Sequence, residues 1–118
     1  MAIAATFMDT CRALVIATPE YTAFRAALSV LDGAGGNGAL TAWYICYGNA
    51  QLGLSPAYRL RKAIRETIAA QGSALSPVER EEAYRSLDAD LVPIHERPRT
   101  RAERRGDLMD LAVAQMLE

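Results

Sequence analysis

The only histidine of the chain lies in the neighbourhood that comes closest to a chemical site. His95 is followed by Glu96 and preceded by Asp88 and Asp90. An imidazole among carboxylates is a donor set for a divalent metal ion or for proton transfer. The spacing matches no established ligand signature, however, and Pro93 places His95 in a connector between two elements. We therefore expect a surface or interhelix histidine, and we predict neither a catalytic residue nor a metal ligand.

A glycine-rich stretch over residues 33–38 contains the pattern G-x-G-x-x-G, at Gly33, Gly35 and Gly38. In dinucleotide-binding proteins this pattern follows a strand within a βαβ unit, and an acidic residue comes about 20 positions later. Here the preceding segment has a helical pattern, and residues 52–60 contain no acid. We interpret the stretch as a hinge or tight crossover between helices, and we expect no cofactor.

The nucleophilic side chains have no recognisable partners in the sequence. Cys11 and Cys46 lie in apolar stretches with no histidine nearby, and no serine has a G-x-S-x-G context. We expect both cysteines to be small buried residues rather than a disulfide. A small enzyme with an unrecognised site is the third interpretation, because catalytic residues meet in space and not in sequence. We predict that the chain is not an enzyme.

The placement of charge is more informative than its total of 13 basic and 14 acidic residues. Arginines gather in two clusters, and arginine suits bidentate contacts with carboxylates and phosphates. The candidate partner-binding residues are Tyr58, Arg59, Arg61, Lys62 and Arg65 in the first cluster and Arg97, Arg99, Arg101, Arg104 and Arg105 in the second. In the alternative interpretation these are solvated helix faces that pair with the acids of residues 79–90, and such exposed pairs contribute at most about 1 kcal/mol each.

The elements that must position these residues are all predicted to be helices, because alanine is abundant and apolar residues recur every three or four positions. Helix starts are marked by Thr18-Pro19, by Ser55-Pro56, and by capping boxes at Ser76/Glu79 and Thr100/Glu103. The predicted helices cover residues 3–17, 19–32, 40–52, 56–72, 76–91 and 100–117.

The spacing of apolar residues also predicts the core. The expected core positions are Ile3, Phe7, Cys11, Leu14, Tyr21, Phe24, Leu28, Leu31, Leu60, Ile64, Ile68, Tyr84, Leu87, Leu91, Leu108, Leu111 and Ala112, with Met109, Val113 and Met116 widening the last stripe. The segment 40–52 is apolar nearly all round, which is typical of a helix at the centre of a bundle or at a partner interface. A short strand is the competing interpretation there, because aromatic residues and isoleucine favour strands. Trp43, Tyr44 and Tyr47 are expected in the core or at that interface.

Together these patterns predict an all-α fold, a compact antiparallel bundle-like domain of five or six short helices that spans residues 1–118 as a single domain. No signal peptide is recognisable, and the longest uncharged run, residues 33–58, is too polar to span a membrane. We therefore expect a cytoplasmic protein with no membrane association.

The expected function is that of a small non-catalytic protein-interaction module, such as an adaptor, a regulatory subunit or an inhibitor. Small inhibitors from phages and mobile elements share this profile. Its partner would be another protein, including a component of a nucleic-acid-handling complex, bound through the arginine-rich face. The alternative is a nucleic-acid-binding regulator that uses the same clusters. A homodimer through the uncharged central helix is a further expectation.

Overall fold

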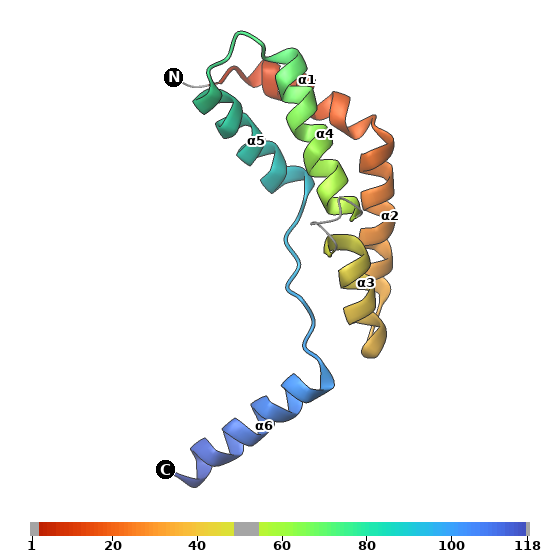
Figure 1. Cartoon of the computed structure of the whole chain (residues 1–118), viewed down its shortest axis with the longest axis vertical. Coiled ribbons are helices and arrows are strands. Elements are labelled where there is room, and N and C mark those ends of the chain that lie inside the picture. Colours follow the sequence, from red (N-terminus) through yellow and green to blue (C-terminus); the bar gives the residue numbers. More distant parts are fainter. Residues whose placement is uncertain (1–2, 49–54, 118) are drawn as a thin grey trace.

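The computed structural model describes residues 3–48 and 55–117, and within them it contains six helices and no strand. The helices are α1 (Ala5–Ile16), α2 (Pro19–Gly33), α3 (Asn37–Tyr47), α4 (Pro56–Gln71), α5 (Pro77–Leu91) and α6 (Arg101–Met116). Figure 1 shows α1 to α5 packed together, with α6 standing apart at the end of an extended segment. The predicted all-α, bundle-like fold of five or six helices is confirmed.

Three helices begin as their sequences predict. Thr18, Ser55 and Ser76 precede α2, α4 and α5, and each side-chain oxygen accepts a hydrogen bond of 3.2 Å from the backbone N–H three residues later. A proline follows each cap and occupies the first helical position. A backbone N–H at that position has no partner within the helix, so the missing N–H of proline costs no hydrogen bond. Local chemistry therefore fixes where these helices begin.

The core is organised around α4, which contacts α1, α2, α3 and α5. Its Leu60, Ile64 and Ile68 are at most 2% exposed, as their spacing of four predicts. Burial of each such side chain contributes about 1.5–3 kcal/mol. Cys11 and Cys46 are also fully buried and form no disulfide, which agrees with their expected role as small buried residues.

One predicted core position of α1 is wrong. Leu14 is 43% exposed, and the buried residues of this helix are Cys11 and Val15. The reason is that α1 packs mainly against α4, with fewer contacts to α2 and α5. A helix with one main neighbour buries a narrower stripe than its apolar residues suggest, so Leu14 lies outside the contact.

The segment predicted over residues 40–52 forms the helix α3 as far as Tyr47, whereas residues 49–52 lie outside the described residues. Of the two places predicted for this helix, the centre of the bundle is wrong, and a partner interface stays a prediction. α3 packs on α2 and α4 at one end of the body, and its Tyr44 and Ile45 are 47% and 59% exposed. The helix at the centre is α4, because it is longer and has apolar residues on the sides that contact its four neighbours.

The glycine-rich stretch joins α2 to α3 directly, so it is a crossover between helices as predicted. Gly36 has a φ of 57°, a backbone conformation that glycine adopts without a steric penalty. The chain leaves α2 in an extended conformation at Ala34 and then makes its turn at Gly36.

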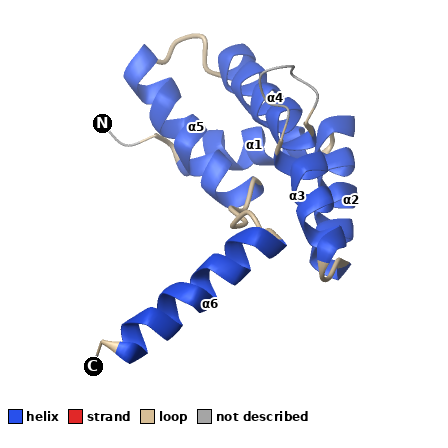
Figure 2. Cartoon of the chain, turned by 60° about the horizontal axis from the view of Figure 1, so that its bottom comes forward, coloured by secondary structure: helices blue, strands red, loops and turns tan. Residues whose placement is uncertain are grey.

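The predicted burial of the last helix is wrong. Leu108, Leu111, Ala112 and the three residues that widen their stripe are all exposed, and none of the described side chains of α6 belongs to the core. Residues 92–100 form an extended connector between α5 and α6 (Figure 1), and Figure 2 shows α6 pointing away from the other helices. Pro93 and Pro98 disfavour helical backbone in the residues before them, which keeps this segment extended.

Candidate interaction surfaces

The first cluster of candidate residues lies on α4 and is partly engaged by α5. Arg61 Nε lies 2.9 Å from Asp88 Oδ1, and an Arg65 guanidinium nitrogen lies 3.1 Å from Glu81 Oε2. Both arginines thus form hydrogen-bonded ion pairs across the α4–α5 contact. The hydrogen bond to Glu81 raises the pKa of Arg65 above its ordinary value.

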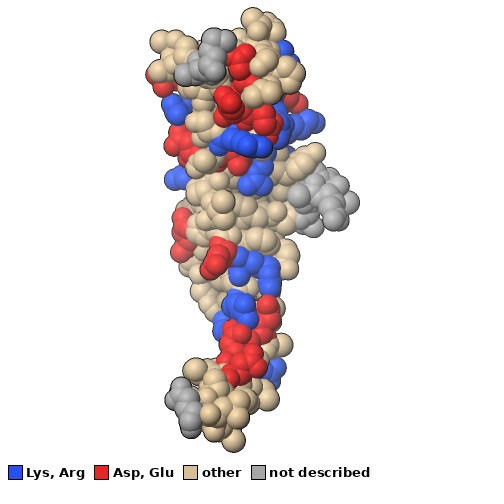
Figure 3. All heavy atoms as spheres, turned by 90° about the vertical axis from the view of Figure 1, so that its left-hand side faces the viewer, with Lys and Arg blue, Asp and Glu red and all other residues tan. Residues whose placement is uncertain are grey.

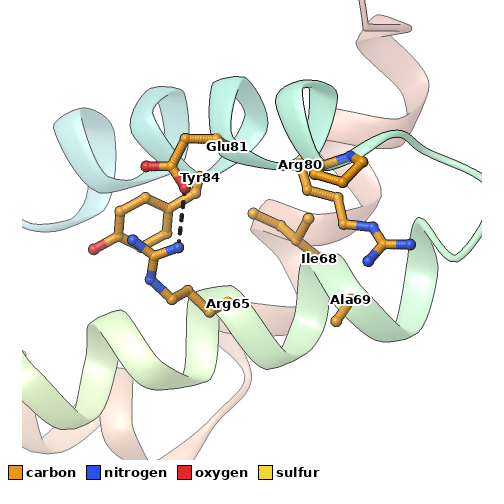
Figure 4. A pocket seen from close by; sticks show the side chains of 7 residues that line it. Arg65, Ile68, Ala69, Arg80, Glu81 and Tyr84 are labelled. Carbon is orange, nitrogen blue, oxygen red and sulfur yellow. Dashed lines mark hydrogen bonds and ion pairs between the residues drawn. The ribbon is translucent and has the colours of Figure 1, made fainter.

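Arg65 also stacks on an aromatic ring. Its guanidinium carbon lies 3.6 Å above the centre of the Tyr84 ring, a cation–π contact. Figure 4 shows Arg65 reaching from α4 toward Tyr84 and Glu81 on α5, at the edge of a pocket that Ile68 also lines. The pocket volume is about 240 Å³, below the ~300–1,000 Å³ typical of small-molecule sites. The pocket is therefore a small gap at the surface where α4 packs against α5.

The other members of the first cluster are exposed, but their surroundings are not purely basic. Tyr58 is 42% exposed, Lys62 is exposed, and Arg59 is engaged in an interaction of its own. All three line a shallow pocket together with Glu20 and Glu66. The positive charge of this part of α4 is therefore balanced by neighbouring carboxylates.

The second cluster begins in the connector, where two arginines fold back onto α6. Arg97 lies 2.8 Å from Glu103, and Arg99 lies 2.7 Å from Asp107. Glu103 also completes the predicted capping box with Thr100. The hydrogen bond from Arg97, followed by those from Thr100, lowers the pKa of Glu103 to about 2. These contacts join the end of the connector to the first two turns of α6.

The remaining arginines of the second cluster are on α6 itself. Arg104 and Arg105 are exposed, and neither takes part in an ion pair within the described part of the chain. The side chain of Arg101 lies outside the described residues. Of the candidate residues whose side chains the structure describes, Lys62, Arg104 and Arg105 are therefore the cations with the most freedom to bind another molecule.

The two clusters lie on different parts of the molecule, the first on the five-helix body and the second on the connector and α6 (Figure 1). Figure 3 shows blue and red side chains interleaved along one face of the molecule, with uncharged surface between them. That the two clusters act as one recognition face stays a prediction.

The connector is held against α2 and α3 by three polar contacts that the sequence did not reveal. Trp43 Nε1 donates a hydrogen bond of 2.9 Å to the backbone oxygen of His95, and the Tyr47 hydroxyl donates one of 2.6 Å to that of Pro93. His95 Nε2 lies 3.3 Å from Asp32 Oδ1 at the end of α2. Burial raises the pKa of Tyr47 from its ordinary value of 10 to about 12, so its hydroxyl keeps its proton to a higher pH than that of an exposed tyrosine.

These contacts separate His95 from the carboxylates that precede it in sequence. Asp88 pairs with Arg61, and Asp90 accepts a hydrogen bond of 2.7 Å from Arg12 on α1. Among the described residues, no group of three or more histidine, cysteine or acidic side chains is arranged to hold a metal ion. His95 is an interhelix residue, as expected.

The apolar residues of α6 form an exposed surface that the sequence did not reveal. Six large apolar side chains on or just after this helix are between 55% and 82% exposed: Leu108, Met109, Leu111, Val113, Met116 and Leu117. Their periodicity was visible in the sequence, but it indicated a buried face. No signal in the sequence distinguishes a helix that packs on its own core from one that is left without a neighbour.

A comparison of this chain with models of protein families, with curated proteins and with solved structures gives no match. Within the part of the chain that the structure describes, no helix combines the length and the apolar character needed to cross a bilayer.

Proposed function

We propose that this chain is a small non-catalytic protein-interaction module in which the five-helix body holds out α6 as the binding element. The observation that carries the proposal is the exposure of Met109, Val113 and Met116, at 69%, 55% and 82%, on a helix that contributes nothing to the core. Exposed apolar surface of this kind marks sites where proteins interact. An adaptor, a regulatory subunit or an inhibitor would use such a helix in the same way.

The chemistry of α6 indicates how such contacts form. An amphipathic helix binds by placing its apolar side chains, spaced by three and four residues, against another apolar surface. Burial of that surface contributes about 25 cal/mol for each Å² removed from water. Arg104 and Arg105 stand on the same helix, so a bound surface with negative charge beside its apolar part would be favoured.

Two matched variants test the role of α6. Ala112 and Ala114 are both exposed on α6 but lie on nearly opposite sides, at about 100° per residue. Each chain is used to capture binding proteins from an extract of the native host. We expect the wild-type chain and Ala114→Glu to capture the same partner and Ala112→Glu to fail to capture it. A host protein that binds all three chains equally would contradict the assignment to α6.

The arginine-rich face is tested with the cations that have no structural role. Reversal of Arg61 and Arg65 would break their pairs with Asp88 and Glu81 and weaken the fold as well as any binding. The sharper variant is Lys62→Glu combined with Arg104→Glu and Arg105→Glu. Unchanged binding of the host partner by this variant would remove these charges from the proposed interface.

Nucleic-acid binding remains the alternative, and the exposure of Arg104 and Arg105 is the observation in its favour. We favour a protein partner because Arg61, Arg65, Arg97 and Arg99 already pair with carboxylates. Phosphate contacts would make the affinity for a generic duplex fall steeply as salt rises. Binding of such a duplex at low salt that disappears on salt titration would support the alternative, and its absence at low salt would exclude it.

A further inference from the structure

The unpartnered side of α6 follows a spacing that is typical of helices that pair with other helices. Ala102, Arg105, Met109, Ala112 and Met116 are separated by three, four, three and four residues and are all exposed. This alternation places them along one seam of the helix, as in the a and d positions of a coiled coil. The seam runs through nearly the whole of α6 (Arg101–Met116).

We propose that the α6 seam binds the same helix of a second copy of this chain, with the two helices antiparallel. This inference rests on the proposed function, in which α6 is the binding element, and it names the partner. The seam is open for such a contact because the connector lies elsewhere. Arg97 and Arg99 bind Glu103 and Asp107, which are on the side of α6 opposite Met109 and Met116.

The side chains of the seam complement one another when one helix is reversed. In the register that places Met109 opposite Ala112 of the second copy, symmetry also places Ala112 opposite Met109. Each central layer then combines a large and a small side chain, which lets two helices approach closely and fill the space between them. In the same register Arg105 faces Met116 of the second copy.

The charges of α6 also favour the antiparallel orientation. Arg104 and Arg105 lie in its first half and have no ion pair among the described residues, whereas its last turn contains no basic residue. The carboxyl end of a helix has carbonyl groups without intrahelical partners and carries partial negative charge. An antiparallel pair brings the arginines of each copy to that end of the other, whereas a parallel pair would place Arg105 beside Arg105.

The size of the contact sets the expected strength. A helix of 16 residues is about 24 Å long, so a pair of them buries less surface than the ~2,000–5,000 Å² of permanent dimers. We therefore expect a reversible dimer with a dissociation constant in the micromolar range.

Sedimentation equilibrium of the full chain, from low micromolar to millimolar concentration, tests the proposal. We expect the wild-type chain and Ala114→Glu to dimerise with dissociation constants within about twofold of each other. Ala112→Glu places a carboxylate in both central layers and should weaken the dimer by about tenfold or more, which corresponds to about 1.4 kcal/mol. Circular dichroism should show all three chains equally helical, because both alanines are exposed and glutamate is also a good helix former.

The orientation is tested by oxidising a mixture of Arg105→Cys and Met116→Cys chains. The native cysteines Cys11 and Cys46 are fully buried, so disulfides will form between the introduced thiols. An antiparallel pair gives the mixed disulfide between the two variants. Disulfides between identical variants alone would overturn the antiparallel orientation.

A wild-type chain that stays monomeric at every concentration would overturn the second copy as the partner, and so would equal weakening by Ala112→Glu and Ala114→Glu. The proposed function fails by a different result. The proposed function is supported if a different host protein binds the monomeric wild-type chain and its binding is lost only with Ala112→Glu. Both the proposed function and the dimer are contradicted if neither a second copy nor any host protein needs Ala112 for binding.

Discussion

The hydroxyl of Tyr47 on α3 donates a hydrogen bond of 2.6 Å to the backbone oxygen of Pro93, which is 46 residues further along the chain. This bond and the one from Trp43 to His95 attach the start of the connector to the body. The connector then turns its Arg97 and Arg99 onto α6. Polar contacts thus tie the start of the connector to α3 and its end to α6.

Removal of the Tyr47 hydroxyl should loosen the connector while the ring remains in place. We expect Tyr47→Phe to lower the free energy of unfolding by about 1 kcal/mol, the typical contribution of one hydrogen bond. Urea denaturation measures the change, and amide exchange at residues 94–97 should become faster. Tyr21→Phe is the control, because the Tyr21 hydroxyl makes no hydrogen bond within the described residues. Equal effects of both variants would contradict the assigned role of this bond.

The same substitution should have opposite consequences in the body and in α6. Leu60 is fully buried, so Leu60→Ala should cost about 2–5 kcal/mol of unfolding free energy through lost burial and a cavity. Leu111 is 56% exposed on α6, so Leu111→Ala should change it by no more than about 0.5 kcal/mol. Thermal and urea denaturation of the two variants at low protein concentration give the comparison. A large loss with Leu111→Ala would show that α6 packs on the body in solution.

The capping residues offer a second comparison between the body and α6. Ser76 and Thr100 make equivalent capping boxes with Glu79 and Glu103. Ser76→Ala should destabilise the whole protein by about 1 kcal/mol, because α5 belongs to the core. Thr100→Ala should reduce the helical content of α6 and leave the main unfolding transition in place. Circular dichroism at low temperature and during heating separates the two effects, and a shifted main transition with Thr100→Ala would be the contrary result.

The ion pair between Arg97 and Glu103 should make the start of α6 sensitive to acid. The pKa of Glu103 is lowered to about 2 in the folded chain, chiefly by the hydrogen bond from Arg97. Because the folded pKa is lower than the ordinary value of 4.5, the ion pair stabilises the ordered start of α6 fully above pH 4.5. This stabilisation is lost as the pH falls from 4.5 to about 2. Carboxyl NMR titration should find the low midpoint, and Arg97→Gln should raise it. An unchanged midpoint in Arg97→Gln would show that Arg97 is not the main cause.

The sequence by itself determined the helices. The prolines at helix starts, the caps at Thr18, Ser55 and Ser76, and the apolar spacing of α4 act over a few residues. Their effects therefore hold whatever the rest of the chain does, and the predicted starts of α2, α4 and α5 agree with the structure.

The tertiary structure alone decided which apolar faces are covered. The pattern Leu108, Leu111 and Ala112 is as periodic as Leu60, Ile64 and Ile68, yet one set is exposed and the other is buried. Periodicity records that a helix has an apolar side, whereas burial depends on which elements lie beside it. The hydrogen bonds from Trp43 and Tyr47 to the connector join residues about 50 positions apart, and no local pattern encodes such a contact. The same limit applies to Arg61 and Arg65, whose partners Asp88 and Glu81 are set by the packing of α5 on α4.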